Sequence, residues 1–216
     1  MGHDGPMTTD RPPSRRLPSW IPWVAGLAAF LLTLVAGGAL AGDWVARNVQ
    51  LRDLVVAIEG SESAMGTVQD QISAAFDAYA AKKNPSDADK DAFDATLSNI
   101  AANGASSIAL AGDKVAAVKL LPWDVAIWNS RQAYLNHNLA WQEYLSAAAL
   151  DPIELTKDQA AINDTFLVFE KTITAAVPDP ALFDLKKRVA HLFIEQAPAD
   201  APAQGPMQAA GLHLAA

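Results

Sequence analysis

The sequence predicts an all-α protein in which a single N-terminal transmembrane helix precedes an antiparallel four-helix-type bundle with a short fifth helix. Three observations support this fold class. An uncharged apolar stretch ends before Asp43, and apolar residues then recur at helical spacing in segments separated by Pro-containing turns. β-branched and aromatic residues nowhere form the short clusters that are typical of strands.

The apolar stretch is long enough to cross a bilayer. No charged residue occurs between Arg16 and Asp43, and the interval contains the apolar run Trp20–Leu40. A helix of about 20 residues spans the hydrocarbon core. Trp20 and Trp23 at one end, and Trp44 at the other, occupy the positions of an aromatic belt. We therefore expect Trp20–Leu40 to contact the lipid bilayer as a transmembrane segment.

Two processing histories are compatible with this segment. As a signal-anchor it stays in the membrane; as a secretory signal it is cut after the small-x-small triplet Ala39-Leu40-Ala41, which releases a secreted domain. The apolar run is longer than the core of a usual cleaved signal, which favours the anchor. A buried core helix is a third, less favoured interpretation.

The charges that flank the segment predict its orientation. Arg11, Arg15 and Arg16 precede it, whereas Arg47 and Arg52 follow it. Positive residues favour the cytoplasmic side, so we expect a single-pass plasma-membrane protein with its N-terminus in the cytoplasm and its bundle outside. The expected domains are a disordered cytoplasmic tail (1–19), a transmembrane signal-anchor (20–42), an extracytoplasmic helical bundle (43–196) and a disordered tail (197–216).

The first bundle helix is expected from Asp43 to about Lys83, because this stretch lacks Pro and turn clusters. Apolar positions in it repeat every seven residues, as in a coiled-coil seam. Gly60 and Gly66 weaken the helix and indicate a close helix approach or a local bend. The seam positions are Leu51, Ile58, Met65, Ile72 and Tyr79, with Leu54, Ser61, Val68 and Ala75 as their companions.

Four more helices are expected after the Asn84-Pro85 break, where Ser86 or Asp87 caps the next helix. Asn103-Gly104 indicates a break within the second helix. The third begins at Leu121-Pro122, and the fourth begins at Thr156, where Thr156-Lys157-Asp158-Gln159 has the spacing of a capping box. The expected ranges are 87–119, 121–150, 156–177 and 180–196.

Composition excludes several functions. From Asp43 onward there are 13 Lys/Arg against 22 Asp/Glu, and this acidic balance disfavours nucleic-acid binding. Cysteine is absent, which rules out disulfides, thiolate zinc sites and a cysteine nucleophile.

No catalytic, cofactor or metal motif is recognisable. Asp184, His191 and Glu195 have spacings that place them on one helical face, but no second His accompanies them, which favours a solvated face over a metal site. The acidic run that begins at Asp87 lacks the loop glycine and the terminal Glu of an EF-hand, and helix N-termini favour carboxylates. We therefore predict no enzyme activity, no cofactor and no metal.

One candidate ligand pocket comes from the aromatic third helix. Tyr134, His137, Trp141 and Tyr144 recur at helical spacings and combine stacking surfaces with polar groups. The simpler interpretation is an aromatic helix that packs into the core, with His137 at its polar edge.

Two functions remain. The favoured one is a membrane-anchored, non-enzymatic extracytoplasmic protein that acts as a protein–protein interaction or assembly/scaffold subunit, with a protein partner or a homo-oligomer. The alternative is an extracytoplasmic, sensor-like bundle that binds a small ligand in the aromatic pocket.

Overall fold

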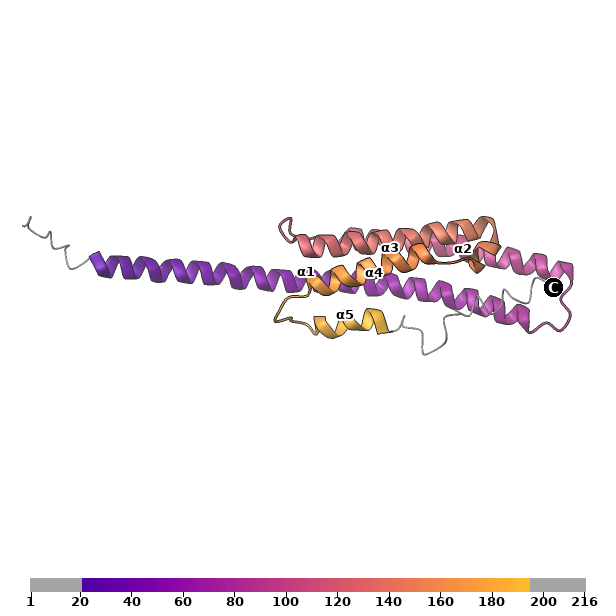
Figure 1. Ribbon diagram of the computed structural model, residues 1–216, viewed down its shortest axis with the longest axis horizontal. Coiled ribbons are helices and arrows are strands. Elements are labelled where there is room, and N and C mark those ends of the chain that lie inside the picture. Colours follow the sequence, from indigo (N-terminus) through magenta and orange to yellow (C-terminus); the bar gives the residue numbers. More distant parts are fainter. Residues whose placement is uncertain (1–20, 195–216) are drawn as a thin grey trace, which may run out of the picture. The chain divides into compact units, whose positions relative to one another are not determined.

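The computed structural model describes residues 21–194, with side chains from Phe30 to Phe193. The sequence predictions for residues 1–20 and 195–216 lie outside this part. The described part contains five α-helices, one 3₁₀ helix and no strand, in agreement with the predicted all-α class (Figure 1). The elements are α1 (Ile21–Ala80), α2 (Asp87–Ala116), α3 (Val125–Leu150), η1 (Pro152–Thr156), α4 (Ala160–Ala176) and α5 (Leu185–Ile194).

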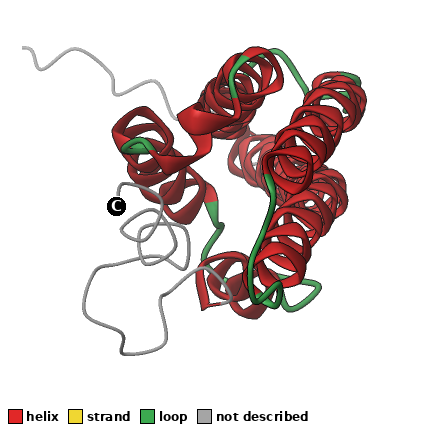
Figure 2. Cartoon of the chain, turned by 90° about the vertical axis from the view of Figure 1, so that its right-hand side faces the viewer, coloured by secondary structure: helices red, strands yellow, loops and turns green. Residues whose placement is uncertain are grey.

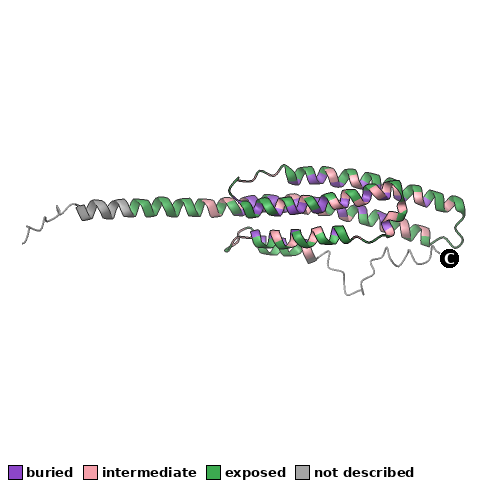
Figure 3. Cartoon of the chain, turned by 45° about the horizontal axis from the view of Figure 1, so that its top comes forward, coloured by how far each residue is buried: buried purple, intermediate pink, exposed green. Residues whose placement is uncertain are grey.

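The chain divides into two compact units, residues 1–43 and 44–216. In the first unit, every described side chain from Phe30 to Gly42 is exposed (Figure 3). The most apolar window of α1 has a mean hydropathy of 1.3, and none of it is buried. By length and composition α1 can therefore cross a membrane, a test that a signal sequence near an N-terminus also passes.

The second unit contains the helical body, by which we mean residues 44–193. Successive helices run in opposite directions along its length (Figure 1). α3 packs against α2 on one side and α4 on the other. α5 packs against α4, and hydrogen bonds join the segment 180–188 to α1. Viewed nearly end-on, the helices of the body lie around a common centre (Figure 2).

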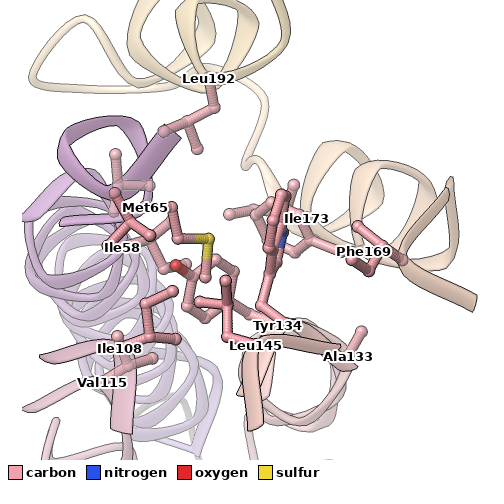
Figure 4. Packing of buried hydrophobic residues seen from close by; sticks show 14 of the residues in the cluster. Ile58, Met65, Ile108, Val115, Ala133, Tyr134, Leu145, Phe169, Ile173 and Leu192 are labelled. Carbon is pink, nitrogen blue, oxygen red and sulfur yellow. The ribbon is translucent and has the colours of Figure 1, made fainter. Parts of the chain in front are cut away.

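The seven-residue seam of the first helix forms part of this core, as its spacing predicts. Side chains from all five α-helices converge on the core (Figure 4). The seam is therefore covered by helices of the same chain. Its buried members are Leu51, Leu54, Ile58, Ser61, Met65, Val68 and Ile72, while Ala75 and Tyr79 are half-buried.

The N-terminal cap of α2 also agrees with the sequence. The Ser86 hydroxyl oxygen accepts a hydrogen bond from the backbone N–H of Asp89, and the Asp89 carboxylate accepts one from the Ser86 backbone at 2.9 Å. This reciprocal pair satisfies two N–H groups that a helix start leaves without partners. Hydrogen bonds to Lys82 and Ser86 keep the pKa of Asp89 below its ordinary value.

Several predicted helix limits are wrong. α2 ends at Ala116 rather than Lys119, and α3 begins at Val125 rather than at Leu121-Pro122. The predicted capping box at Thr156 is absent, because the Thr156 hydroxyl donates to the carbonyl of Ile153 at 2.7 Å and belongs to the 3₁₀ helix. Its local bond competes with a cap, so α4 starts only at Ala160.

The fifth helix is shorter than predicted. It begins at Leu185 rather than Pro180, because Phe183 and Asp184 adopt left-handed backbone angles, with φ of 57° and 54°. Residues in that conformation cannot continue a right-handed helix. The predicted single helical face of Asp184, His191 and Glu195 therefore fails at Asp184, and Glu195 lies outside the described residues.

The glycines that allow close helix packing are not the ones that the sequence predicts. α2 continues unbroken through Gly104, where a Cβ would lie 2.7 Å from Cγ1 of Val68. At Gly112 a Cβ would lie 2.5 Å from Oδ1 of Asn138. Nothing lies within 4 Å of the Cβ position at Gly60 or Gly66. The close helix approaches are therefore made by α2, and the interpretation of Gly60 and Gly66 as approach sites is wrong.

Candidate functional site

A groove of about 610 Å³ lies beside the middle of α1, between this helix and α5. Among the described residues that line it, the indole of Trp141 comes from α3. Polar and charged side chains of α1 form most of its wall. The lining residues are Glu59, Glu62, Ser63, Met65, Gly66, Thr67, Gln69, Asp70, Trp141, His191 and Leu192.

The groove carries negative charge, and one ion pair fixes part of its wall. Nε of Arg188 donates to Oε1 of Glu59 at 2.9 Å, and a second N–H of the same guanidinium donates to the other carboxylate oxygen. This two-pronged geometry is the strongest arrangement for an Arg–carboxylate pair. The Glu59 carboxylate raises the pKa of Arg188. The pair joins α5 to α1, and Glu62 and Asp70 add further carboxylates to the lining.

The four residues of the sequence-predicted pocket lie in three different environments. Trp141 lines the groove. Tyr134 and His137 are buried among the aromatic rings of α4, with the Phe169 centroid 5.0 Å from Tyr134 and the Phe166 centroid 5.4 Å from His137.

The Tyr144 ring packs edge-to-face on the Trp141 ring, with the centroids 6.0 Å apart. The Tyr144 hydroxyl donates to the carbonyl of Leu155 at 3.0 Å and accepts from Gln159 at 3.1 Å. Burial raises its pKa. Tyr144 therefore attaches η1 and the start of α4 to α3, and its ring contacts the Trp141 ring that lines the groove.

His137 is buried as a neutral ring. The Thr165 hydroxyl donates to the carbonyls of Ala161 and Ile162, so it accepts from Nδ1–H of His137 at 3.2 Å. Nε2 is buried and has no hydrogen-bond partner among the described residues. Burial lowers the pKa of His137 to about 4. At neutral pH the ring therefore serves as an uncharged part of the core.

Asn138 forms a buried polar contact that the sequence analysis did not identify. Its Nδ2 donates to the Ser61 hydroxyl at 3.2 Å and to the carbonyl of Ile108 at 3.1 Å, and its Oδ1 accepts from Gln142 at 2.6 Å. The available signal was its position, four residues after Tyr134 and three before Trp141, on the face that packs inward. Asn138 thus joins α1, α2 and α3 through one amide.

The Tyr134 hydroxyl is buried beside Ser61, Glu62 and Asn138, yet no hydrogen bond of standard geometry reaches it among the described residues. Burial, followed by the charge of Glu62, raises the pKa of Tyr134 well above its ordinary value. We expect Tyr134→Phe to leave the free energy of unfolding unchanged or to increase it, because the lost hydroxyl is poorly satisfied. Denaturant titration in detergent measures this change.

Tyr144→Phe is the matched control, because its hydroxyl makes two hydrogen bonds. We expect that variant to lose about 1 kcal/mol. A larger loss for Tyr134→Phe than for Tyr144→Phe would contradict the assignment.

No group of three or more His, Asp or Glu side chains with metal-binding geometry occurs in the part of the chain that the structure describes. Comparisons with protein-family models, with curated proteins and with solved structures each find no match.

Proposed function

We propose that this protein is a membrane-anchored, non-enzymatic helical protein whose body lies outside the cytoplasm and acts as an interaction or assembly subunit. In this proposal α1 begins as the transmembrane anchor, and the helical body is an antiparallel four-helix bundle to which α5 is added. The observation that carries it is the uninterrupted exposure of Phe30–Gly42, a stretch without charge. Exposed apolar surface of this extent favours a lipid environment.

The partner surface of the body must be sought outside the heptad seam, because the seam is covered by the chain's own helices. A shallower groove of about 280 Å³ between α2 and α3 is the best candidate. The small residues Ala109, Gly112 and Ala116 line it on α2, and Leu139, which is 50% exposed, lines it on α3. Small residues allow a partner helix to approach closely, and an exposed Leu supplies apolar contact.

Cross-linking in native membranes followed by detergent purification tests this proposal. We expect a discrete membrane partner or a homodimer, and we expect Leu139→Arg to abolish it. Leu150→Arg is the matched control: Leu150 is 90% exposed on the same helix but does not line the groove, so the complex should persist. A strictly monomeric protein without a partner would contradict the proposed interaction function. A soluble mature chain that begins at Gly42 would contradict the proposed membrane anchor.

A second function is favoured by the groove that Trp141 lines. Carboxylates beside an aromatic face suit a small organic cation, since both groups attract positive charge. On this proposal the body is a ligand-binding, sensor-like module.

A thermal-shift screen with small amines, carried out on the full chain in detergent, separates the two functions. Binding should raise the melting temperature, and Trp141→Phe should reduce the rise while the unliganded protein stays folded. Trp123→Phe, at an exposed site away from the groove, should leave the rise unchanged. Equal responses in both variants would exclude this groove as the site.

A further inference from the structure

The strongest unexplained surface is the tryptophan turn, by which we mean residues 121–128, the last residues before α3 and the first turn of α3. Trp123 is 60% exposed, Val125 is 62% exposed and Trp128 is 42% exposed. Other large apolar side chains of the body are also exposed, among them Leu110, Leu139 and Leu150, but here two Trp rings and a Val lie within six consecutive residues. A gathered patch of this kind marks an interaction site more often than scattered exposed residues do.

The exposed rings are held in place by a built structure. Nε1 of Trp128 donates to the carbonyl of Leu121 at 3.1 Å. The guanidinium of Arg131 lies 3.9 Å from the centroid of the Trp128 ring and donates to the carbonyls of Ala116 and Val118. The Trp128 ring is therefore held against Arg131 and the backbone of Leu121 while it stays 42% exposed.

The tryptophan turn contacts the first residues of the body. The side-chain oxygen of Gln50 accepts a hydrogen bond from the backbone of Leu121, and Arg47 pairs with the buried Asp124 at 3.7 Å. Arg47 and Gln50 follow Asp43, the first charged residue after the uncharged segment, by four and seven residues, so in sequence the contacts of the turn come soon after that segment.

A second loop lies at the same end. Nε1 of Trp44 donates to the carbonyl of Pro180 at 2.8 Å, and Asn48 accepts from the backbone of Leu182 at 2.6 Å. The exposed ring of Phe183 lies 5.0 Å from the guanidinium of Arg52. Aromatic rings beside Arg side chains therefore recur on both loops that close this end.

Charge distinguishes the two ends of the helical body. The end near the tryptophan turn (residues 43–53, 113–131 and 178–188) contains eight Lys/Arg and six Asp. The opposite end (residues 75–94 and 150–164) contains four Lys and nine Asp/Glu. Anionic headgroups, where the leaflet that faces the body contains them, repel the second end and attract the first. Trp is also the residue that the lipid headgroup layer favours most clearly, together with Tyr.

We propose that the tryptophan turn rests in the headgroup layer of the bilayer that anchors the chain. The occupant of the patch is therefore lipid. This inference depends on the proposed membrane anchor, and it adds a second lipid contact that comes from the folded body.

Single-cysteine labelling tests the proposal, and the chain is suited to it because it contains no Cys. We would place a nitroxide label on the full-length protein in nanodiscs of neutral and anionic phosphatidyl lipids. Three variants are compared: Val125→Cys in the turn, Leu150→Cys at the other end of α3, and Val35→Cys in the apolar segment. All three positions are exposed in the structure, at 62%, 90% and 71%.

The readout is the ratio of label accessibility to oxygen over accessibility to a water-soluble nickel complex. We expect a high ratio at Val35, an intermediate ratio at Val125 that exceeds the Leu150 value several-fold, and an aqueous value at Leu150. Adding Trp123→Ser to Val125→Cys should move the label toward water.

The outcomes separate this inference from the anchor. If the label at position 35 lies in the hydrocarbon core while the label at position 125 is as accessible to water as the label at position 150, the proposed lipid contact is wrong and the proposed anchor is unaffected. An aqueous Val35 label overturns the anchor and the inference together. A Val125 label that is aqueous in nanodiscs but protected in native membranes identifies a protein as the occupant, and it also overturns the lipid assignment.

Discussion

Lowering the pH from 7 to 4 should destabilise the helical body by about 3 kcal/mol through His137 alone. The pKa of this residue falls from its ordinary 6.5 to about 4 in the folded chain, and each unit of difference corresponds to about 1.4 kcal/mol. Because the folded pKa is the lower one, the stabilisation is fully present above pH 6.5 and is lost as the pH falls toward 4. Urea titrations of the full chain in detergent at several pH values would measure it.

His137→Phe is the control, since a phenyl ring does not titrate and the site is lined by Tyr134 and Phe166. The variant should have a nearly flat stability between pH 6.5 and 4. The pKa of Asp89 also lies below its ordinary value, but its contribution is lost only below its ordinary pKa of 3.8. An acid loss in His137→Phe as large as in the wild type would refute the role of His137.

The second large effect is on the free energy of unfolding, which substitution by alanine should lower at Gly104 and raise at Gly60. At Gly104 a new Cβ would meet the branched Val68 side chain at 2.7 Å and Cδ1 of Leu145 at 3.3 Å. Overpacking of this kind costs about 1–3 kcal/mol, and it exceeds the gain of about 1 kcal/mol from helix propensity. Val68 has few alternative rotamers, so it cannot move away cheaply.

Gly60→Ala is the matched substitution in α1, where no atom lies within 4 Å of the new Cβ. It should stabilise the body by about 1 kcal/mol, because alanine has a higher helix propensity than glycine and meets no steric clash at this position. Thermal unfolding in detergent compares the two variants directly. The same sign at both positions would show that α1 and α2 do not approach each other at Gly104.

The seam of α1 and the all-α class could be predicted because both follow from periodicity, which is a local property of the chain. Leu51, Ile58 and Met65 are buried where a seven-residue repeat places them. The helix starts were harder to predict, because side-chain hydrogen bonds compete at those points. Thr156 has the spacing of a cap and instead bonds within the preceding turn.

The candidate site was less accessible to sequence reasoning, because it depends on contacts between distant segments. Periodicity places Tyr134, His137 and Trp141 on neighbouring positions of one helix, but it does not identify the helix that faces each of them. Trp141 meets the groove beside α5, whereas His137 meets Thr165 of α4. The Arg188–Glu59 pair joins residues that are 129 positions apart, and no local pattern indicates it.

The amide of Asn138 also helps to set the alignment of the bundle. A heptad pattern matches itself after a slip of seven residues, so apolar packing alone leaves neighbouring alignments of α1 nearly equal in energy. Ser61 is the single hydroxyl-bearing position among the companions Leu54, Ser61, Val68 and Ala75. After a slip in either direction Asn138 would face Leu54 or Val68, and its buried N–H would lose an acceptor at a cost of about 1–3 kcal/mol. Asn138 therefore favours one sliding position of α1, together with the contacts that Asn48, Gln50 and Glu59 make with distant segments.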